Sequence, residues 1–194
     1  MDSTPYYNTH ALKYITDTIN ADMSAIRGRF LAYIPAGGSI LDAGCGPGRD
    51  SKAFRDLGFD VYAMDASEAM VEHCRTIIDD RVTLASFQEY TTELKFDGIW
   101  ACASLLHLEP EELKSVITKF AGFLKPGGVF FMSFKYGTED YVKDGRYFNC
   151  QTEESIAELL NSLNEVEIIE NFITSDVRPG RPGERWLNVI ARNA

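Results

Sequence analysis

The sequence predicts a single α/β domain: a mostly parallel sheet of seven strands with an antiparallel last strand, helices on both faces and a helical cap at the N-terminus. Two observations carry this prediction. Helical and strand patterns alternate from about residue 39 to the end of the 194-residue chain, which is typical of parallel sheets with helical crossovers. The segment GVFFMSF is an apolar run, as expected for a central parallel strand that is buried on both faces.

Four strands are predicted in the first half of the chain, each a short apolar run bounded by turn residues. A helix over 51–57 follows the first strand, and Gly58 ends it. Ser67 is a good N-cap for the next helix, whose apolar residues recur at helical spacing. The four strands cover residues 39–46, 59–65, 81–86 and 95–104.

The second half continues the same alternation. Pro110 suits the first turn of a helix whose apolar residues follow the 3.6-residue period, and the turn KPGG ends this helix before the fifth strand, 128–134. Thr152 opens another helix, and two strands over 165–174 and 185–192 close the chain.

The residues before the first strand are expected to form a helical lid. Helical patterns cover 10–19 and 22–34, and these helices can pack over the top of the sheet. The sequence therefore divides into an N-terminal lid, 1–38, and the main part of the domain, 39–194, without a linker between them.

Charge and composition exclude several functions. Acidic side chains outnumber basic ones by 29 to 19, which gives a formal net charge of −10. Domains that bind nucleic acid usually present a basic face, so we expect neither nucleic acid nor an anionic membrane as partner. The cysteines and histidines lack metal-ligand spacing, no apolar run approaches the roughly 20 residues that span a bilayer, and the N-terminus does not resemble a signal peptide. A cytoplasmic protein with reduced thiols and no metal site is expected.

The segment ILDAGCGPGRDS is the most informative part of the chain. A buried strand ends at Asp42, and Gly44, Gly46 and Gly48 form a tight turn into a helix whose N-terminus offers free N–H groups. Ligands of open α/β sheets bind at this edge of the sheet. The dinucleotide pattern G-x-G-x-x-G fails, because Arg49 stands at the third glycine position counted from Gly44. A phosphate-loop pattern is also missing.

This turn resembles the glycine-rich motif D-x-G-x-G-x-G of the class I S-adenosylmethionine-dependent methyltransferases. The resemblance implies a Rossmann-like fold in which the turn approaches the methionine part of the cofactor, S-adenosylmethionine. Cys45, inside the turn, is interpreted as a packing residue rather than a nucleophile. The cofactor-binding candidates of the turn are Asp42, Ala43, Gly44, Cys45, Gly46, Gly48 and Arg49.

Asp65 ends the second predicted strand, 19 residues after Gly46. At this separation a carboxylate reaches a ribose in this type of fold, and one carboxylate accepts hydrogen bonds from both ribose hydroxyls. An aspartate at a strand end is by itself more often a helix cap, but beside the glycine turn we favour ribose binding. Ala66, Ser67 and Met70 follow it as further cofactor candidates.

The resemblance covers roughly residues 37–135, and the chain also resembles the tellurite-resistance-type subgroup of small methyltransferases. It implies that the turn after the third strand flanks the adenine, and that Cys102, Ala103 and Ser104 border the methionine end. The family often has an acidic residue at the adenine amino group, and this turn has none. The adenine candidates are Ser86, Phe87 and Gln88.

The N-terminal segment is rich in tyrosine. Small methyltransferases that resemble this chain often begin with an aromatic-rich helix over the methionine end of the cofactor, and a tyrosine suits such a lid because it combines an apolar ring with a hydroxyl group. Tyr14 is therefore a cofactor candidate, and Tyr6 and Tyr7 are acceptor candidates. The alternative is that all three only pack the helix against the sheet.

Methyl transfer from a sulfonium is a direct displacement, so the protein mainly aligns the acceptor and excludes water. A base is needed only where the acceptor loses a proton. His107 is a possible base, although a lone histidine after a strand is more often a local hydrogen-bonding residue. The strand ends and the last loop present the other acceptor candidates: Ser104, Lys135, Tyr136, Arg178, Arg181 and Arg185.

The three arginines of the last loop suggest an anionic acceptor, because guanidinium groups bind carboxylate and phosphate in two-point contacts. The alternative is that they pair with acidic side chains of the protein itself. We expect an enzyme with a small, anionic methyl acceptor. A module that binds the cofactor without catalysis, an NAD-dependent oxidoreductase and a protein acceptor stay open as alternatives, as does the oligomeric state.

Overall fold

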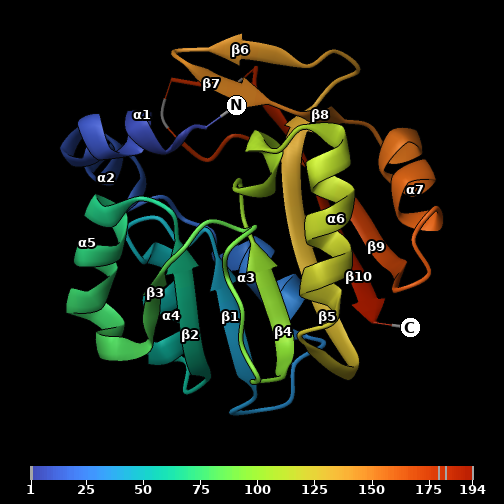
Figure 1. The fold of residues 1–194 in the computed structure, drawn as a ribbon, viewed down its shortest axis with the longest axis horizontal. Coiled ribbons are helices and arrows are strands. Elements are labelled where there is room, and N and C mark those ends of the chain that lie inside the picture. Colours follow the sequence, from blue (N-terminus) through green and yellow to red (C-terminus); the bar gives the residue numbers. More distant parts are fainter. Residues whose placement is uncertain (1, 179, 182, 194) are drawn as a thin grey trace.

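The computed structural model describes residues 2–193 except 179 and 182. Its main sheet has the order β3-β2-β1-β4-β5-β10-β9, and β8 pairs with the end of β5 (Figure 1). Neighbouring strands from β3 to β5 are parallel, whereas β10 is antiparallel to both β5 and β9. The strands are β1 (Ser39–Ala43), β2 (Asp60–Asp65), β3 (Val82–Leu84), β4 (Phe96–Ala101), β5 (Leu124–Tyr136), β8 (Cys150–Gln151), β9 (Val166–Ser175) and β10 (Arg185–Asn193).

This topology confirms the predicted fold class, with three differences. The sheet contains β8 as an eighth strand, which is too short to have a pattern in the sequence. The segment KPGG, predicted as a turn, lies inside β5, where the pairing with β4 shifts its register between Phe96 and Gly98. A separate hairpin of β6 (Tyr141–Lys143) and β7 (Arg146–Phe148) was not predicted, because neither strand is an apolar run.

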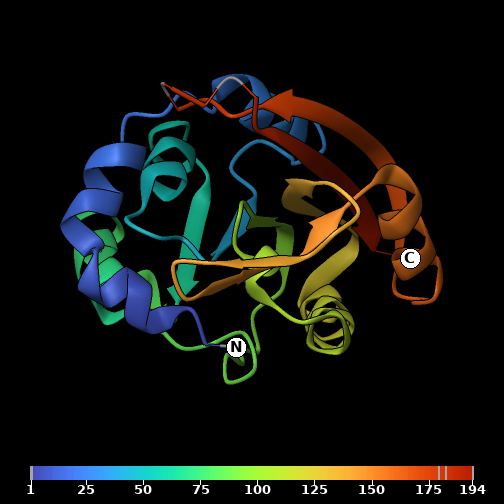
Figure 2. The same cartoon turned by 90° about the horizontal axis from the view of Figure 1, so that it is seen from above.

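Helices cover both faces of the sheet (Figures 1 and 2). Phe30, Phe54 and Cys74 join one apolar core, from α3 (Ser24–Leu31), α4 (Arg49–Asp56) and α5 (Glu68–Ile78). On the other face, α6 (Pro110–Ala121) and α7 (Glu153–Asn161) contribute Phe120 and Ile156 to a second core. The central strand β5 supplies side chains to both cores, which explains its apolar sequence.

Three helices, α5, α6 and α7, start where the sequence predicts, whereas α4 starts at Arg49, two residues before the predicted start. The Ser67 hydroxyl accepts a hydrogen bond from the Met70 amide (3.3 Å) at the start of α5, and the Thr152 hydroxyl accepts one from the Ser155 amide (3.2 Å) at the start of α7. Pro110 occupies the first position of α6, where its missing N–H has no partner to lose. These caps place the helices, and therefore the loops before them, at one edge of the sheet.

Three helices precede β1, whereas the sequence predicts two. The first two, α1 (Thr4–Thr9) and α2 (Ala11–Thr18), lie with the β6–β7 hairpin above the carboxyl ends of the parallel strands (Figures 1 and 2). The third, α3, instead packs on the sheet, where Ile26 and Phe30 are buried. Two segments more than a hundred residues apart in the chain thus cover the same edge of the sheet.

None of the helices in the described residues is long and apolar enough to cross a membrane. The four cysteines are all free thiols. Three of them are buried, and Cys102 is partly exposed at the end of β4.

Gly98 on β4 provides a test of the packing of α3 on the sheet. A Cβ atom added there would lie 2.4 Å from Ile34 Cδ1 and 2.6 Å from Phe30 Cζ. We expect Gly98→Ala to lower the free energy of unfolding by ~1–3 kcal/mol, as overpacking of a core does. Gly28→Ala is the matched control: it lies within α3 with open space around it, so the substitution should raise stability by ~0.5–1 kcal/mol. Urea denaturation of both variants measures the two effects, and equal stability of Gly98→Ala and wild type would contradict this packing.

Candidate active site

The glycine turn between β1 and α4 requires glycine at specific positions. Gly44 and Gly48 have φ angles of +78° and +88°, which other residues rarely adopt. A Cβ atom on Gly44 would lie 2.4 Å from the Ser104 Cβ atom, and one on Gly48 would lie 2.8 Å from the Cys74 sulfur. The amides of Gly44 and Cys45 both donate to the Met64 carbonyl, at 2.8 and 3.0 Å. The turn is therefore held closely against the ends of β2 and β4.

The Asp65 carboxylate links this turn to the start of α5. One oxygen, Oδ2, accepts a hydrogen bond from the Gly46 amide, and Oδ1 accepts one from the Ser67 amide, each at 2.8 Å. Burial raises the pKa of Asp65, and the hydrogen bonds from the Ser67, Gly46 and Ala66 amides act in the opposite direction. Because a carboxylate has about four lone-pair sites, this group retains the capacity to accept a further hydrogen bond.

A cavity of about 670 Å³ opens beside Asp65 and the glycine turn. Helix α1 lies at one side of it: Asn8 Oδ1 accepts a hydrogen bond from the Ser67 hydroxyl (2.6 Å), which joins α1 to the start of α5. Most of the predicted cofactor-binding residues line this cavity, namely Tyr14, Gly44, Gly46, Asp65, Ala66, Ser67, Met70, Ser86, Phe87, Gln88, Cys102 and Ala103.

The other predicted cofactor residues, Asp42, Ala43, Cys45, Gly48 and Arg49, are not among the described residues that line this cavity. Asp42 is buried and accepts a hydrogen bond from the Ser51 hydroxyl (2.6 Å). Burial raises its pKa, as does the nearby charge of Asp50. Cys45 lies in the same core as Cys74, in agreement with its interpretation as a packing residue.

Arg49 is held by a buried carboxylate behind the turn. Its Nε and Nη2 atoms donate to the two oxygens of Asp50 at 3.2 and 2.6 Å, and Arg27 Nη1 donates to the same group at 2.7 Å. Burial alone would raise the pKa of Asp50, but the charge of Arg49, with that of Arg27, outweighs burial and the pKa is lowered. Trp100 Nε1 also donates to Asp50, at 3.1 Å. This cluster joins α3, α4 and β4 beneath the site.

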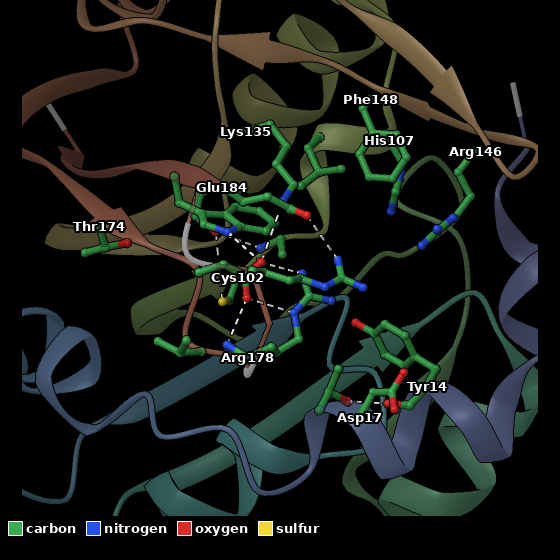
Figure 3. Close-up of a pocket in the computed structure, with 18 of the residues that line it drawn as sticks. Tyr14, Asp17, Cys102, His107, Lys135, Arg146, Phe148, Thr174, Arg178 and Glu184 are labelled. Carbon is green, nitrogen blue, oxygen red and sulfur yellow. Dashed lines mark hydrogen bonds and ion pairs between the residues drawn. The ribbon is translucent and has the colours of Figure 1, made fainter.

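A second cavity of about 320 Å³ adjoins the first (Figure 3). Of the predicted acceptor residues, Ser104 lines the first cavity instead, and Tyr136 and Arg185 are outside the described lining of both. The predicted acceptor residues that do line it are Tyr6, Tyr7, His107, Lys135, Arg178 and Arg181. The two cavities share a wall, which consists of Tyr7, Tyr14, Cys102, Ala103 and His107.

The arginines of the last loop have partners within the protein. Arg178 donates through Nε (2.9 Å) and Nη2 (2.5 Å) to the two oxygens of Asp176, whose side chain is only 2% exposed. Burial by itself raises the pKa of Asp176, but the hydrogen bonds from Arg178 lower it strongly. Arg181 lies 3.5 Å from a Glu184 oxygen, and Arg185 stacks over the Tyr136 ring at 4.4 Å. These contacts agree with the alternative that the arginines pair within the protein.

Tyr7 and His107 form a hydrogen-bonded pair at the shared wall. His107 Nδ1 lies 2.7 Å from the Tyr147 carbonyl oxygen, and Nε2 lies 2.7 Å from the Tyr7 hydroxyl. Since a carbonyl only accepts, Nδ1 carries the hydrogen, and Nε2 accepts from Tyr7. Burial lowers the pKa of His107 to about 4 and raises the pKa of Tyr7. Near neutral pH, the pair is therefore uncharged and has a defined direction of hydrogen bonding.

Sequence reasoning missed several residues that line the second cavity, among them Arg146, Phe148, Asp176 and Trp186. The hairpin that carries Arg146 and Phe148 has no motif, and only the fold brings it over the strand ends. Asp176 was detectable in principle, because it lies two residues before Arg178 in a short loop, at a distance from which it can pair with that arginine.

Comparisons with known proteins extend these observations. Residues 40–128 match the family model of a methyltransferase domain. The cypemycin N-terminal methyltransferase of a Streptomyces species is 34% identical over 101 residues, which cover 50% of this chain and 41% of that protein. The carboxy-S-adenosyl-L-methionine synthase of Aliivibrio salmonicida is 27% identical over 160 residues, 74% of this chain and 65% of that protein. The chain thus spans less than two thirds of the length of these relatives.

Solved structures share the fold at low sequence identity. The 1,6-didemethyltoxoflavin-N1-methyltransferase of Burkholderia thailandensis, crystallised with 1,6-didemethyltoxoflavin and S-adenosylhomocysteine, has a TM-score of 0.77 and 22% identity, and the match covers 100% of this chain and 92% of that one. The magnesium protoporphyrin IX methyltransferase of Synechocystis, with bound S-adenosylmethionine, has a TM-score of 0.72 and 19% identity, with 98% and 95% covered. The matched region and the shared fold agree with the resemblance to class I methyltransferases. The tellurite-resistance-type subgroup stays a prediction.

The buried, neutral His107 predicts a pH dependence of stability. Its pKa of about 4 in the folded protein lies below the value of about 6.5 in an unfolded chain, so its contribution is complete above pH ~6.5 and is lost as the pH falls toward 4. We expect His107→Gln to reduce the slope of the free energy of unfolding against pH in this window and to leave the slope above pH 7 unchanged. Urea denaturation at a series of pH values measures both slopes. Equal slopes below pH 6.5 would show that His107 is not buried as the neutral form.

Proposed function

We propose that the protein is an enzyme that binds S-adenosylmethionine in the larger cavity and transfers its methyl group, by direct displacement, to a small anionic acceptor in the smaller one. One observation carries this proposal. The partly buried Asp65 carboxylate faces a cavity of about 670 Å³, and one wall of this cavity is shared with a second cavity of about 320 Å³. A donor and an acceptor that occupy the two cavities would meet at that wall.

The residues of the larger cavity fit this cofactor. The lone pair of Asp65 that the neighbouring backbone amides leave free suits a ribose hydroxyl. Gly44 and Gly46 line the cavity without side chains, so a ligand can approach the backbone of the turn. The adenine end would lie beside Ser86, Phe87 and Gln88, and the methionine end beside Tyr14, Cys102 and Ala103.

The lid would orient the reactants and exclude water. When bound, S-adenosylmethionine supplies a methyl group on a positively charged sulfur. Tyr7 and Tyr14 stand between the two cavities, with their rings edge to face at 5.0 Å, and Asn8 holds their segment on α5 through the Ser67 hydroxyl (2.6 Å). We propose that residues 1–38 contribute this lid mainly through α1 and α2. Alignment and removal of water are the main contributions that a protein makes to such a transfer.

His107 is proposed to orient Tyr7 rather than to act as a strong base. Its Nε2 accepts the hydrogen of the Tyr7 hydroxyl, and its pKa of about 4 makes the imidazole a weak proton acceptor. The Tyr7 oxygen is then fixed at the wall where the acceptor atom would stand. An acceptor atom that carries an acidic proton, or none, suits this arrangement better than an alcohol does.

The second cavity also supports an enzyme over a module that only binds the cofactor. It is an open space beside the proposed methyl position, and its size is near the lower end of the range for small-molecule sites, about 300–1,000 Å³. Its wall includes Lys135, Arg146 and Arg178, in a chain whose net charge is −10. These cations favour an anionic acceptor of small size over nucleic acid.

Asp65→Ala tests the cofactor site. The substitution removes a charged acceptor of the ribose hydroxyls, and hydrogen bonds to charged groups contribute about 1.5–3 kcal/mol, so we expect the dissociation constant of S-adenosylhomocysteine to rise at least about 10-fold in calorimetry. Asp60→Asn, at the exposed opposite end of β2 beside Arg81, is the matched control and should bind like wild type. Absence of binding by the wild-type protein, or binding of NADH in its place, would refute the proposed cofactor.

A further inference from the structure

We propose that Arg146, on the β6–β7 hairpin, binds the carboxylate group of the methyl acceptor, so that the acceptor is a small carboxylic acid. This inference rests on the proposed function, and it assigns the anion site to a residue outside the arginine-rich loop. Arg146 lines the smaller cavity beside His107 and Phe148 (Figure 3).

The Arg146 guanidinium is buried without a complete set of partners. Its side chain is only 13% exposed, and its Nε atom is one of the few buried side-chain nitrogen or oxygen atoms, among the residues that the structure describes, without a hydrogen-bond partner. A buried donor that is left unsatisfied costs about 1–3 kcal/mol, so this N–H group is poised for an acceptor from outside the protein.

Three aromatic rings lie close to this guanidinium. Its Cζ atom lies 3.7 Å from the centre of the Tyr6 ring, 5.2 Å from that of Phe148 and 5.7 Å from that of Tyr7. These contacts, together with a hydrogen bond between the Arg146 and Tyr7 side chains, hold the guanidinium in place. The unpaired Nε–H belongs to the side of a guanidinium that can bind a carboxylate with two parallel hydrogen bonds.

The acidic neighbour of Arg146 makes only a long contact with its guanidinium. The Asp144 carboxylate lies 3.6 Å from Nη2, beyond ordinary hydrogen-bond length, and its side chain is 57% exposed. Exposed ion pairs of this kind contribute little binding energy. Asp144 thus leaves the Nε–H group of Arg146 without a partner.

The other cations around the cavity are more completely committed. Arg178 uses two nitrogens on Asp176, and Arg49 uses two on Asp50. Lys135 pairs with Glu184 and stacks over Trp186. Figure 3 draws Lys135, Glu184 and Arg178 within one connected network, whereas Arg146 stands apart from it. A ligand that bound one of the paired cations would have to break its existing ion pair. A ligand that bound Arg146 would instead give its Nε–H group the hydrogen-bond partner that it lacks.

The position of Arg146 also suits an acceptor. The same Tyr7 ring that neighbours the guanidinium carries the hydroxyl that donates to His107, and both Tyr7 and His107 line the two cavities. A carboxylate held at Arg146 would leave the rest of a small acid directed along this wall, toward the methionine end of the larger cavity. Tyr6, which stacks on Arg146, belongs to the lid helix α1, so the anion site is complete only when the lid is in place.

Benzoate and its neutral analogue benzamide provide the test, because they have nearly the same shape and differ in charge. Calorimetry with the protein saturated with S-adenosylhomocysteine should show benzoate binding at least about 10-fold more tightly than benzamide. Arg146→Gln should abolish this preference and keep the affinity for S-adenosylhomocysteine within twofold. Arg146→Lys should recover only part of it, because a lysine lacks the planar fork. Arg185→Gln, outside the cavity, is the matched control and should behave as wild type.

A nuclear magnetic resonance measurement on the wild-type protein covers the case in which Arg146→Gln does not fold. The Nε–H signal that Arg146→Lys removes should shift with benzoate and not with benzamide. Equal benzoate affinity in wild type and Arg146→Gln, equal affinity for the two probes, or an unmoved Nε–H signal would overturn the inference. Failure of the wild type to bind S-adenosylhomocysteine would contradict the proposed function alone. The affinities of wild type and the Arg146 variants for benzoate and benzamide, measured without S-adenosylhomocysteine, would still decide the role of Arg146.

Discussion

The Asp65 carboxylate is the contact on which the arrangement of the site depends. It accepts hydrogen bonds from the Gly46 amide in the glycine turn and from the Ser67 amide at the start of α5. Two loops that follow different strands are thereby held at one distance from each other. Ser67 in turn caps α5 and holds Asn8 of the lid. The turn, the helix and the lid are consequently coupled through one buried acidic group.

Segments that are distant in the chain cover the carboxyl ends of the parallel strands. The lid helices come from the N-terminus, and the β6–β7 hairpin follows the central strand. They meet where Tyr7 contacts His107 and Tyr6 stacks on Arg146. Aromatic contacts at this junction combine apolar burial with polar groups directed inward. Both cavities therefore depend on the same closed position of α1.

Charge is distributed unevenly between the surface and this edge. The chain carries 29 acidic and 19 basic side chains, yet several cations gather around the smaller cavity. Most of them are neutralised locally, as Arg178 is by Asp176 and Arg49 by Asp50. Pairing of this kind rigidifies the wall without creating a strong positive field. What distinguishes Arg146 from its neighbours is its unsatisfied Nε–H and not its charge.

The sequence by itself determined the parallel sheet, the starts of α5, α6 and α7 and the cofactor edge, because these features follow from local patterns. Apolar runs, capping residues such as Ser67 and Thr152, and the spacing from the glycine turn to Asp65 are all visible within short windows. Only the tertiary structure decided which charged side chains are free. The sequence showed three arginines in one loop, whereas the fold paired Arg178 with Asp176, turned Arg185 onto Tyr136, and brought Arg146 from another segment over the cavity. The availability of a charge depends on partners from distant strands, and no local pattern records those partners.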